Sequence, residues 1–294
     1  MSDAVQILKD LEPAREFFIG IDSDGCVFDS MELKHKECFC PQFINHFGLQ
    51  AVSKYARETW QFVNLYSTTR GVNRFKALVR ALELLADRDE VKARAVVPSR
   101  AEGVRKWIER ESKLGNPALK AEIERNPDPD LQQAMAWSLE VNEVIGKIVR
   151  DVPPFPGVVE SIKCMNQKAD TVVVSQTPAE ALEREWKEHG IDGLVRAIAG
   201  QEMGTKAEHL ALAARDKYPA DKILMLGDAP GDFKAARANG ALFYPVVPGA
   251  EEAAWQRFRD EALDRFFAGT YAGDYEKKLI REFEKSLPEN PPWS

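Results

Sequence analysis

The stretch FFIGIDSDGCVFD, residues 17–29, decides the fold, because it places two carboxylates and a glycine directly after an apolar run. An apolar run of this length that ends in turn-forming residues predicts a strand buried on both faces. In an open parallel sheet, ligands bind beyond the carboxyl ends of the strands. Asp22 and Asp24 are therefore expected at the edge of a cleft.

The spacing of Asp22 and Asp24 favours a shared site. Alternate residues of an extended chain point the same way, and Gly25 allows the backbone to leave the strand through angles closed to other residues. Two adjacent carboxylates repel each other, so their burial requires a cation or a shared proton. An oxygen-binding ion such as Mg²⁺ meets that requirement. A plain turn, or part of a calcium loop, is the alternative interpretation.

The composition is that of a folded, enzyme-sized protein. The 294 residues suffice for one large or two smaller domains, and 44% of them are hydrophobic. The net charge of -7 is spread without a basic block, which argues against a nucleic-acid-binding surface. Neither a secretory leader pattern nor an apolar run of about 18 residues occurs, so we expect no membrane insertion. Four irregularly spaced cysteines predict no disulfide framework and a cytoplasmic location.

Residues 31–149 are expected to form a helical block. Their apolar residues recur at helical spacing, with hardly any strand-like alternation. The clearest sets are Phe39, Phe43, Ile44 and Phe47, and then Phe75, Leu78, Val79, Leu82 and Leu85. Further helices are predicted over residues 101–114, 118–125 and 131–149, with a proline-containing break at residues 126–129.

A proline cluster in residues 151–157 marks the expected domain boundary. Beyond it, short apolar strands alternate with helical runs, a repetition that implies parallel strands. The expected strands cover residues 171–174, 195–199, 223–226 and 242–246, and the expected helices cover residues 179–188, 206–217 and 233–239. The first strand is of the same type, so the helical block is predicted to be an insertion. We expect a core of residues 1–32 and 152–294 and a helical cap of residues 33–151.

The C-terminal part, residues 251–287, carries aromatic and aliphatic residues at roughly helical intervals. Its helices are expected to pack on the sheet edge or on the cap, with a subunit contact as the alternative. The last residues, PENPPWS at 288–294, are expected to be loosely held.

Two further positions suit a phosphate group. Ser175 ends an apolar run, where its hydroxyl and nearby backbone N–H groups can hold a phosphate oxygen, although the same pattern fits a helix N-cap. Lys206 opens a helical run, where the helix dipole does not favour a cation. An anionic partner explains that placement, and a solvated surface lysine is the alternative.

A second strand also delivers carboxylates. The apolar residues 223–226 lead into Gly227 and Asp228, and Asp232 follows four residues later. Carboxylates at the ends of two strands of one sheet predict a metal site.

Together these segments resemble the haloacid dehalogenase superfamily of hydrolases. The four motifs of that superfamily occur in order, as Asp22-Ser23-Asp24-Gly25, Ser175, Lys206, and Gly227-Asp228-Ala229-Pro230-Gly231-Asp232. The resemblance covers the sheet domain on both sides of the insertion. The insertion is similar to the C1 cap of the phosphoglycolate phosphatase and β-phosphoglucomutase branch, but longer. The resemblance implies a Rossmann-like, three-layer α/β core with an all-helical cap.

The resemblance also implies a role for each acid. Asp22 would be the nucleophile that forms an aspartyl-phosphate, and Asp24 the general acid and then the general base. Mg²⁺ would be held by Asp22, by the backbone carbonyl of Asp24 and by Asp228, with Asp232 supporting it.

The remaining residues would bind the substrate. Ser175, Gln176 and Lys206 would contact the phosphoryl oxygens. In the cap, Arg70 and Arg74 flank a glycine turn that resembles a specificity segment of related caps, and arginine suits a carboxylate or a second phosphate. Two solvated arginines at an exposed helix start are the alternative.

The function implied is that of a magnesium-dependent phosphatase acting on a small phosphorylated metabolite. An acid at position 24 separates the chain from dehalogenases and phosphonatases, which resemble this pattern but lack it. A sugar phosphomutase and a non-catalytic metal- or phosphate-binding member of the same superfamily stay open.

Overall fold

The computed structural model describes residues 2–293 and divides the chain into two compact units. The core unit comprises Met1–Met31 and Asp151–Ser286, and the cap unit comprises Glu32–Arg150 and Leu287–Ser294. The expected core extended to residue 294, whereas the structure groups the last eight positions, 287–294, with the cap.

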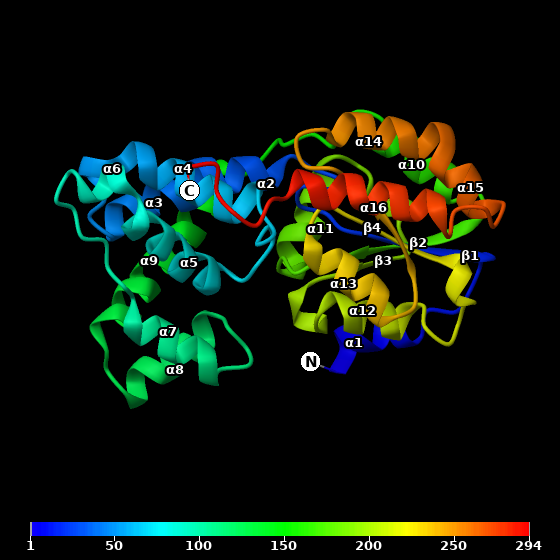
Figure 1. Ribbon diagram of the computed structural model, residues 1–294. Coiled ribbons are helices and arrows are strands. Elements are labelled where there is room, and N and C mark those ends of the chain that lie inside the picture. The colour runs from blue at the N-terminus through cyan, green and yellow to red at the C-terminus, as the bar shows by residue number, and fades with distance from the viewer. Residues whose placement is uncertain (1, 294) are drawn as a thin grey trace. The chain divides into compact units, whose positions relative to one another are not determined.

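The core unit is built on one five-stranded sheet with the strand order β3-β2-β1-β4-β5 (Figure 1). Its strands are β1 (Phe17–Ile21), β2 (Ala169–Val174), β3 (Ala197–Ala199), β4 (Ile223–Gly227) and β5 (Leu242–Pro245). Every pairing is parallel, as the alternation of strands and helices predicted. Strand β1, which Asp22 directly follows, therefore lies at the centre of the sheet.

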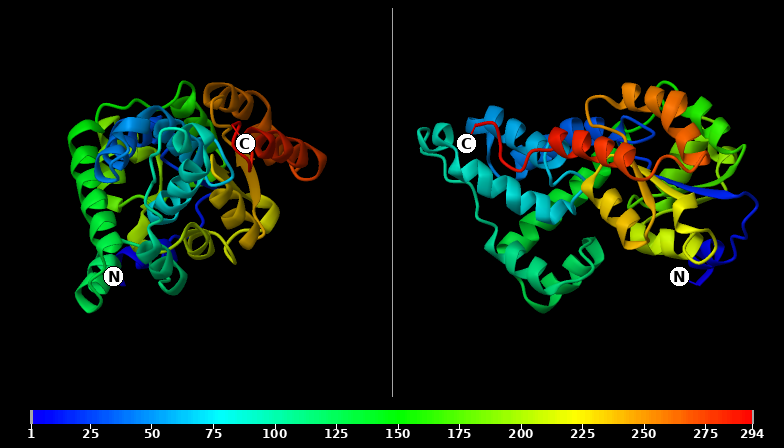
Figure 2. Two further views of the ribbon diagram at one scale, coloured as in Figure 1. Left: turned by 60° about the vertical axis from the view of Figure 1, so that its left-hand side comes forward. Right: turned by 45° about the vertical axis from the view of Figure 1, so that its right-hand side comes forward.

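Helices cover both faces of this sheet, which confirms the three-layer α/β prediction (Figures 1 and 2). Those of the core unit are α1 (Ser2–Lys9), α10 (Val158–Met165), α11 (Ala179–Glu188), α12 (Lys206–Ala213), α13 (Pro230–Ala238), α14 (Glu251–Arg257), α15 (Leu263–Phe267) and α16 (Asp274–Ser286). In both figures, α12 and α13 lie on one side of the sheet and α10 and α14 on the other.

Strand β1 shows how the two faces are filled. Phe17, Ile19 and Ile21 join the apolar cluster that includes residues of α10 and α14. On the opposite face, a Cβ atom at Gly20 would lie 2.9 Å from Leu210 Cδ2 of α12. The helix therefore approaches the strand closely, and a larger residue at position 20 would push the layers apart.

The C-terminal helices pack on the sheet edge, as expected from their aromatic pattern. Tyr271 donates a hydrogen bond to the carbonyl of Phe243 in the edge strand β5, at 2.7 Å. The rings of Phe243 and Phe283, the latter in α16, lie 5.8 Å apart in an edge-on arrangement.

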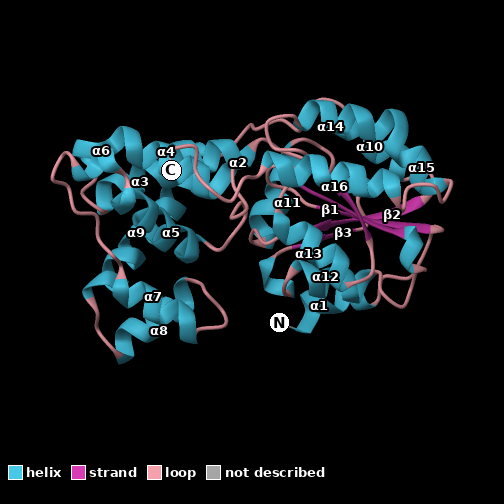
Figure 3. Cartoon of the chain, viewed as in Figure 1, coloured by secondary structure: helices cyan, strands magenta, loops and turns pink. Residues whose placement is uncertain are grey.

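The described part of the insertion is helical, and Figure 3 draws no strand there. Its α-helices are α2 (Ser30–Leu33), α3 (Cys40–His46), α4 (Ser53–Leu65), α5 (Arg74–Asp87), α6 (Asp89–Lys92), α7 (Glu102–Arg110), α8 (Asn116–Arg125) and α9 (Pro129–Ile148), with a π-helical turn at Lys34–Phe39. Asp128 caps α9 by accepting hydrogen bonds from two backbone N–H groups, and Pro129 occupies the first turn. The predicted break at residues 126–129 is therefore a helix start.

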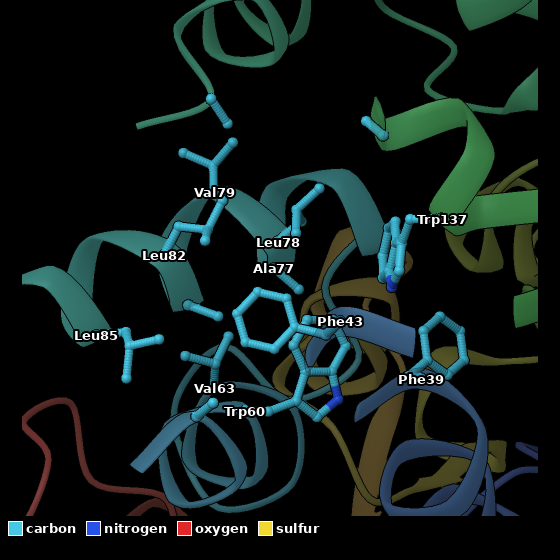
Figure 4. Packing of buried hydrophobic residues seen from close by; sticks show 14 of the residues in the cluster. Phe39, Phe43, Trp60, Val63, Ala77, Leu78, Val79, Leu82, Leu85 and Trp137 are labelled. Carbon is cyan, nitrogen blue, oxygen red and sulfur yellow. The ribbon is translucent and has the colours of Figure 1, made fainter. Parts of the chain in front are cut away.

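The cap has its own apolar core, separate from that of the sheet unit (Figure 4). The ring of Trp60 lies 4.9 Å from Phe43 and 5.8 Å from Trp137. The two apolar sets predicted from helical spacing contribute to this core, Phe47 as a partly buried member. Helical periodicity thus identified the packing faces of the insertion.

The C-terminal tail departs from its prediction. Instead of being loosely held, it packs on the cap unit: Leu287 is buried, and the carbonyl of Pro288 accepts a hydrogen bond from Thr68 N at 3.3 Å. Trp293 lies 5.5 Å from the ring of Phe62, and the guanidinium of Arg88 sits 4.3 Å from the Trp293 ring centre. An aromatic anchor near the chain end outweighs the entropy that favours a free tail.

No helix within residues 2–293 combines the length and apolar character that a bilayer crossing requires. All four cysteines carry free thiols, in agreement with the expectation of no disulfide framework.

Candidate active site

Parallel register brings three strand ends together. Ile21 of β1 pairs with Val173 of β2 and with Leu226 of β4. The residues that follow these pairs leave the sheet side by side at its carboxyl edge. Asp22, Ser175 and Asp228, which are far apart in sequence, therefore lie at the same edge.

The turn after β1 is held by its backbone. Asp22 N donates to the carbonyl of Leu226 at 3.0 Å, which continues the sheet pairing by one residue. The carbonyl of Ser23 accepts from the N–H groups of Val27 and Phe28, and Gly25 has φ 77°. That φ is strained for any residue with a Cβ, so the structure gives the glycine the role that its position suggested.

Three acids meet around one lysine. Oxygens of Asp22, Asp228 and Asp232 all lie within 4.8 Å of one another, and all three residues are buried. Lys206 Nζ lies 2.6 Å from Asp22 Oδ2 and also donates to Asp232 Oδ1. The predicted acids and the predicted lysine thus come from three separate segments to one point.

Burial and neighbouring charges shift the pKa values of Asp22 and Lys206. Burial raises the pKa of Asp22 well above its ordinary value, Lys206 opposes the rise, and the carboxylates of Asp232 and Asp228 add to it. Burial alone would lower the pKa of Lys206, but Asp22 and Asp232 outweigh it and raise that pKa. The lysine is therefore a fixed positive charge at neutral pH.

The donor set fits a divalent metal ion. Three carboxyl groups gather around one ammonium in a buried site. Hard carboxylate oxygens are the ligands that Mg²⁺ prefers, and a bound cation would favour the ionised form of these acids. Asp22, Asp228 and Asp232 supply side-chain oxygens for such an ion.

Asp232 is held rigidly by the motif that surrounds it. Its Oδ2 accepts a hydrogen bond from Ala229 N at 3.0 Å. A Cβ atom at Gly227 would lie 2.3 Å from Asp232 Cγ, so only glycine leaves room for the carboxyl group. Gly227 is a functional residue in this sense, because its missing side chain makes space for an acid of the cluster.

The predicted phosphate-binding turn follows β2. Ser175 is buried, its N–H donates to the carbonyl of Ala199 at 3.0 Å, and its Oγ accepts from Thr177 N at 3.2 Å. This arrangement leaves the hydroxyl proton of Ser175 to donate to an anion. The side-chain amide of Gln176 instead donates to the carbonyl of Gly204 at 2.8 Å. For Gln176, the backbone N–H is therefore the group suited to a phosphate.

Asp24 is held by two hydroxyl groups that the sequence analysis did not single out. Ser30 Oγ donates to Asp24 Oδ1, and Thr177 Oγ1 donates to Asp24 Oδ2 at 2.6 Å. Trp186 of α11 supports the same loop, because its Nε1 donates to Ser23 Oγ at 3.0 Å. The sequence gives no signal for these contacts, since each joins residues whose proximity depends on the folded loops.

The two predicted specificity arginines belong to the cap unit and differ in their surroundings. Arg70 is buried, and its Nη1 donates to the carbonyl of Leu65 at the end of α4, at 2.9 Å. Arg74 donates to Asn142 Oδ1 at 2.7 Å and to Ser138 Oγ at 3.0 Å, and its guanidinium lies 5.1 Å from the Phe39 ring centre. Burial lowers the pKa of Arg74 to about 10.

Comparison with known proteins agrees with this geometry. Residues 19–240 match the family model described as haloacid dehalogenase-like hydrolase. This chain belongs to that family. The match spans both sides of the insertion and includes every predicted core-site residue. The protein is thus a hydrolase of the haloacid dehalogenase-like type, while the family alone does not specify its substrate.

Solved structures are similar to this chain at low sequence identity. One that carries the name haloacid dehalogenase-like hydrolase, from Bacteroides fragilis, has a TM-score of 0.52 at 15% identity and covers 82% of this chain and 93% of its own. A predicted phosphoglycolate phosphatase from Haemophilus somnus has a TM-score of 0.46 at 15% identity and covers 82% and 92%. No curated protein matches the chain.

Proposed function

We propose that this hydrolase is a magnesium-dependent phosphatase that releases phosphate from a small phosphorylated metabolite through an aspartyl-phosphate on Asp22. The observation that carries the proposal is the buried cluster in which Asp22 lies beside two further acids and Lys206. Such a site holds a carboxylate nucleophile while providing positive charge for the anionic group it attacks.

In the first step, an oxygen of Asp22 attacks the phosphorus atom, and the bond from phosphorus to the leaving oxygen breaks. Asp24 donates a proton to that oxygen, so the leaving group departs as an alcohol. Lys206, the Ser175 hydroxyl and the backbone N–H of Gln176 stabilise the charge on the phosphoryl oxygens.

In the second step, Asp24 accepts a proton from a water molecule, and the resulting hydroxide oxygen attacks the phosphorus. The bond between phosphorus and Asp22 breaks, which returns the carboxylate and releases inorganic phosphate. Asp22, Asp228, the backbone carbonyl of Asp24 and Asp232 would hold Mg²⁺, directly or through water. When bound, the ion supplies positive charge that reduces repulsion between nucleophile and phosphate.

For the leaving group, we propose a second anionic function that is recognised by Arg74. Within residues 2–293, no carboxylate pairs with this guanidinium, which donates to the amide oxygen of Asn142 and to the hydroxyl and carbonyl oxygens of Ser138. A partly buried cation without a counter-charge favours a carboxylate or phosphate ligand. Arg70 donates a hydrogen bond to the carbonyl of Leu65 and so supports the turn that leads to Arg74.

The decisive experiment measures phosphate release from p-nitrophenyl phosphate by the purified full-length protein. We expect turnover with Mg²⁺, loss of turnover after chelation with EDTA and recovery when Mg²⁺ is restored. Asp22→Asn should abolish turnover because an amide is a poor nucleophile. Asp221→Asn, an exposed acid of the same unit, is the matched control and should behave as wild type.

Equal rates in wild type and Asp22→Asn would disprove the nucleophile assignment. Turnover that survives complete chelation would disprove the metal requirement. Isomerisation of a sugar phosphate with little phosphate release would instead favour a phosphomutase, and metal binding without any turnover a non-catalytic role.

A further inference from the structure

The carboxyl group of Asp24 is anchored at both of its oxygens. Ser30 Oγ donates to Oδ1, and Thr177 Oγ1 donates to Oδ2. The two donors reach the acid from different segments, because Ser30 begins α2 and Thr177 lies beyond β2. Two hydrogen bonds on opposite oxygens fix the plane of the carboxyl group, whose terminal torsion is otherwise broad.

The anchors are themselves fixed. Ser30 is completely buried, so its hydroxyl requires a partner within the protein, and Asp24 is that partner. Thr177 is tied by its backbone: its N–H donates to Ser175 Oγ at 3.2 Å, and its carbonyl accepts from Gln201 N at 3.0 Å. These two backbone hydrogen bonds therefore restrict where the hydroxyl of Thr177 can lie.

This arrangement leaves Asp24 able to handle a proton. A carboxyl group has about four lone-pair directions, and the two hydroxyls use one on each oxygen. A general acid uses a different direction for the proton that it passes to the leaving oxygen. Proton transfer depends on the geometry of donor and acceptor, so a group that swings freely is a poor acid catalyst.

We infer that Thr177 and Ser30 are positioning residues that aim Asp24 at the leaving-group oxygen, an inference that rests on the phosphatase function proposed above. Thr177 then differs in role from Ser175 and Gln176 of the same turn. Those two residues are proposed above to bind the phosphoryl oxygens, whereas Thr177 would act through the acid.

A pair of aryl esters isolates this role. p-Nitrophenyl phosphate and phenyl phosphate have similar shapes but different leaving groups. Nitrophenolate leaves readily without a proton, whereas the more basic phenolate depends more strongly on protonation by a general acid. Thr177→Val removes the hydroxyl at nearly constant volume. We expect it to lower kcat/KM, which reports the phosphorylation step, for phenyl phosphate by about 10- to 100-fold, no more than the roughly 10²- to 10⁴-fold that a general acid supplies, and kcat/KM for p-nitrophenyl phosphate much less. Ser30→Ala should show the same pattern, and Thr177→Ser, which keeps the hydroxyl, should restore phenyl phosphate turnover.

Two controls distinguish a loss of Asp24 positioning from a non-specific structural effect of the substitution. Thr171→Val makes the same substitution in β2, where the hydroxyl bonds Asn166 Oδ1 at 2.9 Å, and it should slow neither ester selectively. In the background of Asp24→Asn, which cannot act as the acid, Thr177→Val should cost no further activity on phenyl phosphate. Strong non-additivity of this kind is the signature of a residue that acts through another.

The outcomes distinguish the inference from the function on which it rests. An equal fall in kcat/KM for both esters in Thr177→Val, or full additivity with Asp24→Asn, would overturn the positioning role and leave the phosphatase intact. Absence of turnover of both esters by the wild-type protein with Mg²⁺ would overturn the proposed function, and the inference with it.

Discussion

At the scale of single residues, each unit holds charged side chains away from solvent. In the core unit, Lys206 lies among three buried acids. In the cap unit, Arg74 is a partly buried cation held by neutral groups. Buried charge is costly to a fold, and it is common at functional sites.

Arg74 yields a prediction about substrate choice. Arg74→Gln should raise KM for phosphoglycolate by about 10- to 100-fold, the equivalent of one lost hydrogen bond to a charged group. KM for ethylene glycol phosphate, which has a hydroxymethyl group in place of the carboxylate, should change little. Steady-state kinetics on both esters checks this.

The matched control for Arg74 is Arg80→Gln, on the exposed side of the same helix α5. It should alter neither KM. A KM that rises equally for both esters in Arg74→Gln would show that this guanidinium does not discriminate by charge.

At the scale of elements, Asp170 joins several segments at the end of β2 that lies away from the site. Its Oδ2 accepts from the N–H groups of Ala14 and Arg15 at 2.8 Å each and from the Tyr218 hydroxyl at 2.7 Å. Its Oδ1 accepts from Arg196 Nη1 at 2.5 Å. Burial alone would raise the pKa of Asp170, but these donors outweigh it and lower that pKa below its ordinary value of 3.8.

Because its pKa is lowered, the contribution of Asp170 to the stability of the fold is sensitive to acid. The folded state binds the Asp170 proton more weakly than the unfolded chain, so the stabilisation is complete above pH 3.8 and is lost as pH falls through the lower folded value. Asp170→Asn should lower the free energy of unfolding at pH 7 by about 1.5–3 kcal/mol. The difference from wild type should shrink below pH 3.8.

Urea unfolding of wild type and Asp170→Asn across this pH range measures the effect. The exposed Asp192→Asn serves as control, since its side chain lies at the surface of the same unit. A difference that is independent of pH would show that the loss comes from packing rather than from the charge.

At the scale of the whole molecule, the chain passes between the two units three times, at residues 31–32, 150–151 and 286–287. The third passage is the tail that ends with Trp293 against Phe62 and Arg88 of the cap. Arg88 is almost fully buried and also pairs with Glu58 at 2.8 Å. The tail is therefore part of the cap's packing.

Trp293→Ala should destabilise the cap selectively. Loss of one aromatic pair and one cation–π contact is expected to cost about 1–3 kcal/mol. Because each unit has its own apolar core, unfolding should show the cap transition moving to lower urea while the core transition stays in place.

Pro292→Ala, at an exposed position of the same tail, is the control for Trp293→Ala. Tryptophan fluorescence and far-UV circular dichroism report the two transitions. Unchanged transitions in Trp293→Ala would show that the tail contributes nothing to the stability of the cap.

The amino-acid sequence by itself determined the strands, the parallel sheet, the helical insertion and the acids at the strand ends. These features follow from local patterns: apolar runs, helical spacing, prolines, and a glycine where the turn needs positive φ. Asp22 and Asp228 were predictable because a parallel sheet aligns the ends of its strands, whatever the loops between them do. Lys206 was predicted from its place at a helix start, where the helix dipole does not favour a cation.

The tertiary structure alone decided which hydroxyls hold Asp24, which groups surround Asp170, and where the tail packs. Thr177 and Asp24 are 153 positions apart, and neither has a pattern that signals the other. A hydrogen bond forms only when two side chains come within about 3 Å in the right orientation, a condition that depends on how the loops fold. Periodicity reports which face of an element is buried, but not which polar atoms meet there.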